Sequence, residues 1–156
     1  MNKKETSFAP LQLLGNKISY LHLENSLVAF QDHDASLKRN LDIEYSIDNI
    51  SFDEEANLKV CTITLYTKIS VTTESNLEID LTVAVEGGFT IDGRLPDGEA
   101  EKYLSINGCA SLYSITRAII LSVTAQATNG GKVILPMINT SNLNRRDPNN
   151  PIVKLI

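Results

Sequence analysis

The chain has 156 residues, of which 42% are hydrophobic and 21% are charged, and its formal net charge is −5. This length suits a single domain, and the composition excludes an intrinsically disordered chain. The acidic balance, without a basic stripe to neutralise several phosphates, excludes a general nucleic-acid binder. No segment has the ~20 consecutive apolar residues of a membrane-spanning helix, and the N-terminus has no apolar signal-peptide core. We therefore expect a cytoplasmic protein that is not inserted in a membrane.

Two-residue periodicity predicts strands in the first two-thirds of the chain. Residues 11–23 form the first candidate, with Ile18 and Tyr20 expected on one face and a bulge or break at Gly15-Asn16. Apolar and polar residues then alternate cleanly over residues 41–48. The next strand covers residues 58–73, and the turn between these two segments predicts an antiparallel hairpin.

The alternation resumes at Leu77 and continues through Gly87-Gly88 to Ile91, which predicts a fourth strand. A double glycine within a strand is typical of a bulge or a close approach, so we expect the strand to bend there. Turn residues at 95–98 end the sheet region. The simplest arrangement is four antiparallel strands in meander order.

The periodicity then changes from two residues to three and four. Leu112, Ile115, Ile119 and Val123 recur at the spacing of an amphipathic helix, which predicts one long helix over residues 110–127, with a shorter helical turn over 99–104. Residues 133–138 read as a short extended run, followed by turn and loop. The predicted fold class is α+β, a four-stranded antiparallel sheet with one long helix packed on it.

No catalytic or cofactor motif is found in the sequence. It has no GxSxG, GxGxxG, HExxH or phosphate-binding loop, and it has two histidines and two cysteines. Cys61 lies in an apolar alternation, which indicates a buried reduced thiol. Asp32-His33-Asp34 has the residue types of a metal site but lies in a polar segment without a second cluster, which favours a solvated loop. We expect no enzyme activity, no metal and no cofactor.

Three stretches of this sequence together resemble the SecB family of export chaperones. The first is Val85–Ile91, a strand in which a Gly-Gly pair is followed by an aromatic residue. The second is residues 107–127, in which Leu112, Tyr113 and Arg117 resemble the start of the family's main helix. The third is residues 135–139 with Leu143, similar to the Leu-Pro-apolar-Asn segment after that helix.

The resemblance implies a SecB-like domain over residues 11–143, between an N-terminal arm (1–10) and a C-terminal tail (144–156). It also implies a homodimer or homotetramer that holds nonnative preproteins in a translocation-competent state without ATP. The family's second helix is expected to be reduced, because Pro148 and Pro151 oppose it. Docking to a SecA-type motor is implied through acidic sheet positions, but of the corresponding residues only one is acidic: Lys17, Leu21, Asp80 and Thr82.

A holding chaperone needs apolar and aromatic surface that binds extended chains. The candidates for a client groove are the aromatic residues Tyr20, Tyr45, Tyr66, Phe89, Tyr103 and Tyr113. The candidates for an oligomer interface are Leu112, Ile115, Arg117 and Ile119. Arg117 fits a structural ion pair as well as a dimer contact. Two alternatives stay open: a chaperone for one client, such as the antitoxin of a toxin–antitoxin system, and an oligomeric interaction module without chaperone activity.

Overall fold

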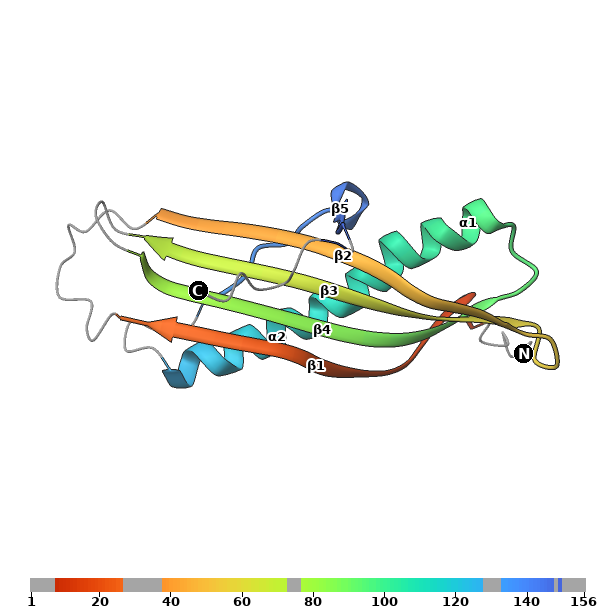
Figure 1. Ribbon diagram of the computed structural model, residues 1–156, viewed down its shortest axis with the longest axis horizontal. Coiled ribbons are helices and arrows are strands. Elements are labelled where there is room, and N and C mark those ends of the chain that lie inside the picture. Colours follow the sequence, from red (N-terminus) through yellow and green to blue (C-terminus); the bar gives the residue numbers. More distant parts are fainter. Residues whose placement is uncertain (1–7, 27–37, 73–76, 128–132, 148, 150–156) are drawn as a thin grey trace, which may run out of the picture.

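A computed structural model describes residues 8–26, 38–72, 77–127, 133–147 and 149 (Figure 1). Four long strands form one sheet, and a continuous helical run crosses one of its faces. In chain order the elements are β1 (Leu11–Asn25), β2 (Lys38–Asp53), β3 (Leu58–Thr72), β4 (Leu77–Asp92), α1 (Asp97–Lys102), the π-helical segment η1 (Tyr103–Gly108), α2 (Cys109–Ala127), the 3-10 turn η2 (Thr140–Asn142) and β5 (Asn144–Arg145). This confirms the predicted α+β class with four long antiparallel strands and one long helix.

The strand order is β1-β4-β3-β2-β5, which corrects the predicted meander. Strands β2, β3 and β4 follow one another as a meander, but β1 pairs antiparallel with β4 and not with β2. The first strand is thus joined to the second across the whole width of the four-stranded sheet. Strand β5, within the segment predicted as a tail, pairs parallel with the outer edge of β2.

Irregularities in the edge strands decide which side chains reach which face. The β1–β4 register shifts between Leu13 and Gly15 and again between Ile18 and Tyr20. Ile18 is opposite Val85 and Tyr20 is opposite Ala84, and consecutive β4 residues point to opposite faces. The prediction that Ile18 and Tyr20 share a face is therefore wrong, because a bulge intervenes.

The Gly87-Gly88 pair does not interrupt β4, whose register with β3 continues through both glycines. The break occurs across from the pair, in β1, and the glycines serve close packing. A Cβ at Gly87 would lie 2.7 Å from Leu112 Cδ2 and 2.9 Å from the Phe89 ring. The missing side chain thus allows α2 to lie directly on β4.

The core lies between the sheet and the helical run. Every second residue of β3 and β4 is buried on this side, which we call the helix face, and it is covered by Leu104, Leu112 and Ile120. Residues 97–127 are long and apolar enough to span a bilayer by length and composition. Because this run supplies side chains to the domain core, we interpret it as the core helix of the fold.

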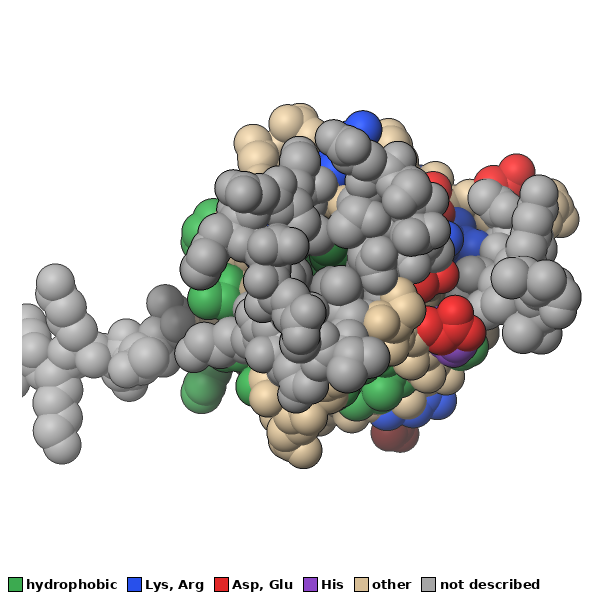
Figure 2. Space-filling view, turned by 90° about the vertical axis from the view of Figure 1, so that its left-hand side faces the viewer, with side chains coloured by type: hydrophobic (Ala, Val, Ile, Leu, Met, Phe, Trp, Pro, Cys, Tyr) green, Lys and Arg blue, Asp and Glu red, His purple; other side chains and the backbone are tan. Residues whose placement is uncertain are grey.

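The opposite face of the sheet, which we call the polar face, carries charged and hydroxyl side chains. It presents Glu44, Tyr66, Thr82 and Glu86 from three neighbouring strands, and Lys17 of β1 pairs with Glu86 at 3.2 Å. An end-on view along the strands shows acidic and basic side chains toward the right of the molecule, and exposed hydrophobic side chains toward the left (Figure 2). The two faces thus offer different surfaces to a partner.

Candidate functional site

The six aromatic residues predicted for a client groove are divided between the two faces of the sheet. Tyr20 and Tyr66 flank Ala84 from the neighbouring strands and lie on the polar face. The other four belong to the core between sheet and helix or pack against it: Tyr45, Phe89, Tyr103 and Tyr113. The six therefore do not line one groove in this structure, and their role in client binding stays a prediction.

Two members of this set are core residues. Phe89 is 1% exposed, and its ring lies beside Gly87. Tyr113 is 5% exposed, and its hydroxyl donates a hydrogen bond of 2.6 Å to the carbonyl oxygen of Pro136. Burial raises the pKa of Tyr113, and nearby Arg117 opposes that shift. Tyr113 thus ties the segment after α2 to the helix.

The four residues predicted for an oligomer interface lie along α2 with different exposures. Leu112 is fully buried against β4, whereas Ile115 and Ile119 are half-buried at the edge of the core. Arg117 donates to the sulfur of the exposed Met137 at 3.0 Å. Half-buried Ile115, Arg117 and Ile119 keep surface for a partner, and their interface role stays a prediction.

An apolar groove lies on the helix face, where the end of β2 passes α1. Its volume is about 350 Å³, and its lining residues are Ile47, Ile50, Lys59, Asp97, Ala100, Glu101, Leu104 and Arg145. A cavity of about 150 Å³ lined by apolar side chains is large enough to bind benzene. The groove therefore has room for a large apolar side chain together with part of its neighbours.

A bulge in β2 produces the most exposed apolar residue of the groove. The β2–β3 register shifts between Asp48 and Ser51, and Asn49 adopts a positive φ of 55°. Asparagine tolerates this conformation better than most residues. The bulge leaves Ile50 62% exposed at the groove, next to the buried Ile47.

Two ion pairs border this groove. Lys59 of β3 pairs with Asp97 of α1, and this contact lowers the pKa of Asp97. Arg145 of β5 pairs with Glu101 of α1 at 3.3 Å. Because each cation has its own carboxylate, the border offers no excess charge, and the groove suits an uncharged apolar group.

Sequence reasoning did not find this groove. None of its lining residues was among the predicted site residues. The available signal was the break in alternation at Asp48-Asn49-Ile50, where an apolar residue follows two polar ones beside a turn-prone asparagine. That signal locates a bulge, but it does not show that α1 crosses the sheet there.

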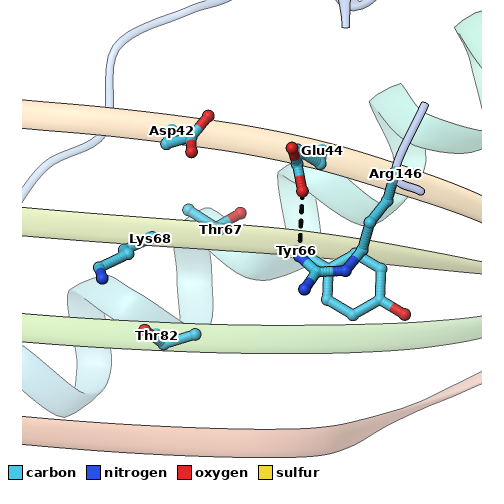
Figure 3. Close-up of a pocket in the computed structure, with 7 residues that line it drawn as sticks. All are labelled: Asp42, Glu44, Tyr66, Thr67, Lys68, Thr82 and Arg146. Carbon is cyan, nitrogen blue, oxygen red and sulfur yellow. Dashed lines mark hydrogen bonds and ion pairs between the residues drawn. The ribbon is translucent and has the colours of Figure 1, made fainter. Parts of the chain in front are cut away.

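A second, smaller hollow of about 70 Å³ lies on the polar face, and Figure 3 shows its lining residues Asp42, Glu44, Tyr66, Thr67, Lys68, Thr82 and Arg146. Arg146 lies over the Tyr66 ring, 4.5 Å from its centroid, and pairs with Glu44 at 2.9 Å. The Arg146 side chain is 12% exposed. The hollow is therefore built around the residue that directly follows β5.

The positions that correspond to the family's motor-docking residues do not form an acidic surface. Lys17, Asp80 and Thr82 lie on the polar face, whereas Leu21 is opposite Val83 and lies on the helix face, 43% exposed. Lys17 is paired with Glu86. SecA docking at these positions stays a prediction without a charge pattern in its favour.

Within the described residues, no three His, Cys, Asp or Glu side chains lie close enough to hold a metal ion. His22 pairs with Glu24 at 3.4 Å on the polar face. Asp32-His33-Asp34 lies outside the described residues. The two cysteines are free and buried, and desolvation raises the pKa of Cys61 to about 11 and that of Cys109 to about 12.

Comparison with known proteins defines the class of fold. No protein-family model matches the chain, and a search of curated proteins found no match. Among solved structures, the SecB-like chaperone Rv1957 of Mycobacterium tuberculosis, in complex with a ChAD peptide from the Rv1956 HigA1 antitoxin, superposes with a TM-score of 0.65. It is 11% identical, and the alignment covers 83% of this chain and 91% of that one. The chain thus has the SecB-like fold, which confirms the resemblance at the level of structure.

A second solved structure is similar. It is a protein of unknown function from Streptococcus agalactiae, with a TM-score of 0.50 and 17% identity, and the alignment covers 81% of this chain and 97% of that one. Because the sequence identities are this low, both similarities show a shared fold and not a shared function.

Proposed function

We propose that this protein is a SecB-like chaperone, which holds nonnative polypeptide segments without ATP and catalyses no reaction. The observation that carries the proposal is the SecB-like fold combined with an apolar groove of about 350 Å³ on the helix face. Exposed apolar surface next to sheet and helix is what a loose, sequence-tolerant polypeptide binder requires. Action in the cytoplasm as a homodimer or homotetramer belongs to the same proposal.

The chemistry of the groove indicates how a client segment binds. The apolar floor of Ile47, Ala100 and Leu104 favours burial of an aliphatic or aromatic side chain. The ion pairs at the border leave a charged client residue no unpaired partner, so such a residue would lose hydration without compensation. Apolar client segments are therefore preferred over charged ones.

The proposal is tested by suppression of aggregation. Purified protein is mixed at equimolar subunit ratio with a chemically denatured preprotein, and light scattering is followed on dilution. Ile50→Ser is compared with Ile134→Ser, a matched control, because these isoleucines are 62% and 61% exposed and Ile134 does not line the groove. We expect suppression by the wild type and the control, and weaker suppression by Ile50→Ser. Absence of suppression by the folded wild type would refute a general chaperone.

The choice of Ile50 follows from the structure. Tyr113→Ala, the substitution that a groove of aromatic residues would suggest, removes a side chain that is 5% exposed and hydrogen-bonded to Pro136. Such a truncation costs about 3–5 kcal/mol of stability. Reduced activity in that variant would therefore report unfolding as much as client binding.

A second candidate within the same fold is a chaperone for one client. Rv1957 is in complex with an antitoxin peptide, and the positions corresponding to the motor-docking residues include one acidic residue, Asp80. This candidate predicts tight binding of one short segment and poor suppression of general aggregation. A pull-down of proteins co-expressed from the neighbouring genes separates the two. Good folding with neither activity would favour an oligomeric interaction module.

A further inference from the structure

Two consecutive arginines hold the β5 segment to opposite faces of the sheet. Arg145 reaches the helix face and pairs with Glu101 of α1 at the groove. Arg146 reaches the polar face, where it pairs with Glu44 and lies over Tyr66 (Figure 3). Alternation along an extended chain places neighbouring side chains on opposite faces. The chain therefore wraps the outer edge of β2 and is fastened on both sides.

The backbone part of this attachment is short. Strand β5 pairs with β2 through two residues, Asn144 opposite Glu44 and Arg145 opposite Tyr45. The amide of Arg146 donates a hydrogen bond of 2.7 Å to the carbonyl oxygen of Tyr45. Two-residue pairing is marginal by itself, so the side chains of Arg145 and Arg146 must contribute to keeping β5 in place.

The segment fastened in this way forms one side of the apolar groove. Arg145 lines the groove itself, and Leu143 immediately before β5 packs against the core. The groove residues Ile47 and Leu104 are 7% and 6% exposed, and Tyr45 is half-buried beside them. Movement of residues 143–146 away from β2 would remove Arg145 from the border of this groove and free the edge of β2.

We propose that β5 is a latch that narrows the client groove from one side, and that the contact of Arg146 with Glu44 and Tyr66 on the polar face holds this latch in place. The inference rests on the proposed chaperone function and names how that same groove is regulated. Release of Arg146 on the polar face would let Arg145 leave the border of the groove, which widens the groove on the helix face. The contact on the polar face is coupled to the groove on the helix face through the peptide bond that joins Arg145 to Arg146. A group that competes with Arg146 for Glu44 on the polar face therefore favours binding of a client in the groove.

The test weakens the latch at a residue outside the groove. Glu44→Gln removes a carboxylate that pairs with Arg146 at 2.9 Å, and Asp42→Asn is the matched control, because Asp42 lines the same hollow and the substitution changes net charge equally. Hydrogen exchange at the Arg146 amide reports the latch without a client. Binding of a fluorescent, extended ten-residue peptide with one central Leu reports the groove, and the same peptide with Ser in place of Leu reports non-specific binding.

For Glu44→Gln we expect faster exchange at Arg146 and affinity for the Leu peptide increased by roughly fivefold, at the lower end of usual coupling between two sites. We expect Asp42→Asn to match the wild type in both. Unchanged or reduced affinity in Glu44→Gln despite faster exchange would overturn the regulatory role, and unchanged exchange would overturn the latch. No preference of the wild type for the Leu peptide would refute the chaperone proposal together with its regulation.

Discussion

Gly87 and its neighbour Gly88 provide a paired test of how the helix packs on the sheet. Both belong to β4, where side chains alternate between the helix face and the polar face. A Cβ at Gly87 would lie 2.7 Å from Leu112 Cδ2, 2.9 Å from the Phe89 ring and 3.2 Å from Leu13 Cδ1. A Cβ at Gly88 would have no heavy atom within 4 Å. The two Gly→Ala substitutions therefore differ in the contacts of the new methyl group, which is crowded at residue 87 and free of contacts at residue 88.

The expected magnitudes follow from this geometry. Gly87→Ala inserts a methyl group into a packed core, where Leu112 and Phe89 are 0% and 1% exposed, so α2 or its side chains must shift at a cost of ~1–3 kcal/mol. Gly88→Ala adds no contact and lowers the conformational entropy of the unfolded chain, which is worth ~0.4–1 kcal/mol of added stability. The free energies of unfolding should therefore move in opposite directions.

The assay is urea denaturation followed by far-ultraviolet circular dichroism, because the chain has no tryptophan. With a urea dependence of about 1–3 kcal/mol per molar, a 2 kcal/mol loss lowers the midpoint by roughly 1 M. Protein concentration is held constant across variants, since an oligomer gains stability by mass action. Equal midpoints for the two variants would refute the conclusion that the missing side chain at Gly87 allows α2 to lie directly on β4.

Two further predictions concern single contacts. The side-chain and backbone hydrogen bonds from Arg94 lower the pKa of Asp92 from 3.8 to about 2, so the contribution of Asp92 to stability is present above pH 3.8 and disappears as the pH falls through about 2. In Arg94→Gln, a carbon-13 titration of the Asp92 carboxyl group should find a pKa closer to 3.8. An unchanged pKa of Asp92 in this variant would contradict the assignment of the shift to Arg94. Thr124→Val should cost ~1–3 kcal/mol in the same urea assay, because the Thr124 hydroxyl accepts the buried amide of Val133 at 2.8 Å. Thr116→Val should cost less, because the Thr116 hydroxyl donates to a carbonyl of its own helix, and equal losses would rule out the Val133 contact as the cause.

The regular elements could be read from the sequence because each imposes its own local period. Alternation over residues 41–48 predicted β2 and its hairpin with β3, and the spacing of Leu112, Ile115 and Ile119 predicted α2 nearly to its ends. The resemblance to SecB rested on the strand, helix and Leu-Pro segments around this helix, and the fold comparison confirms it. Local patterns determine local structure because they record which side of an element is buried.

The candidate site depends on contacts between segments far apart in the sequence, and no local sequence pattern predicts such contacts. The pairing of β1 with β4 is set by contacts between residues far apart in sequence, and the bulge before Tyr20 reverses its face. The apolar groove needs the bulge at Asn49, the crossing of α1 and the return of Arg145, which come from three separate segments. Strand β5 has two residues and too little length for a period, so the sequence predicted a tail there. The sequence alone determined where the four long strands and the long helix form. The tertiary structure decided the short strand β5 and which faces the elements share, because long-range packing places side chains from distant segments together.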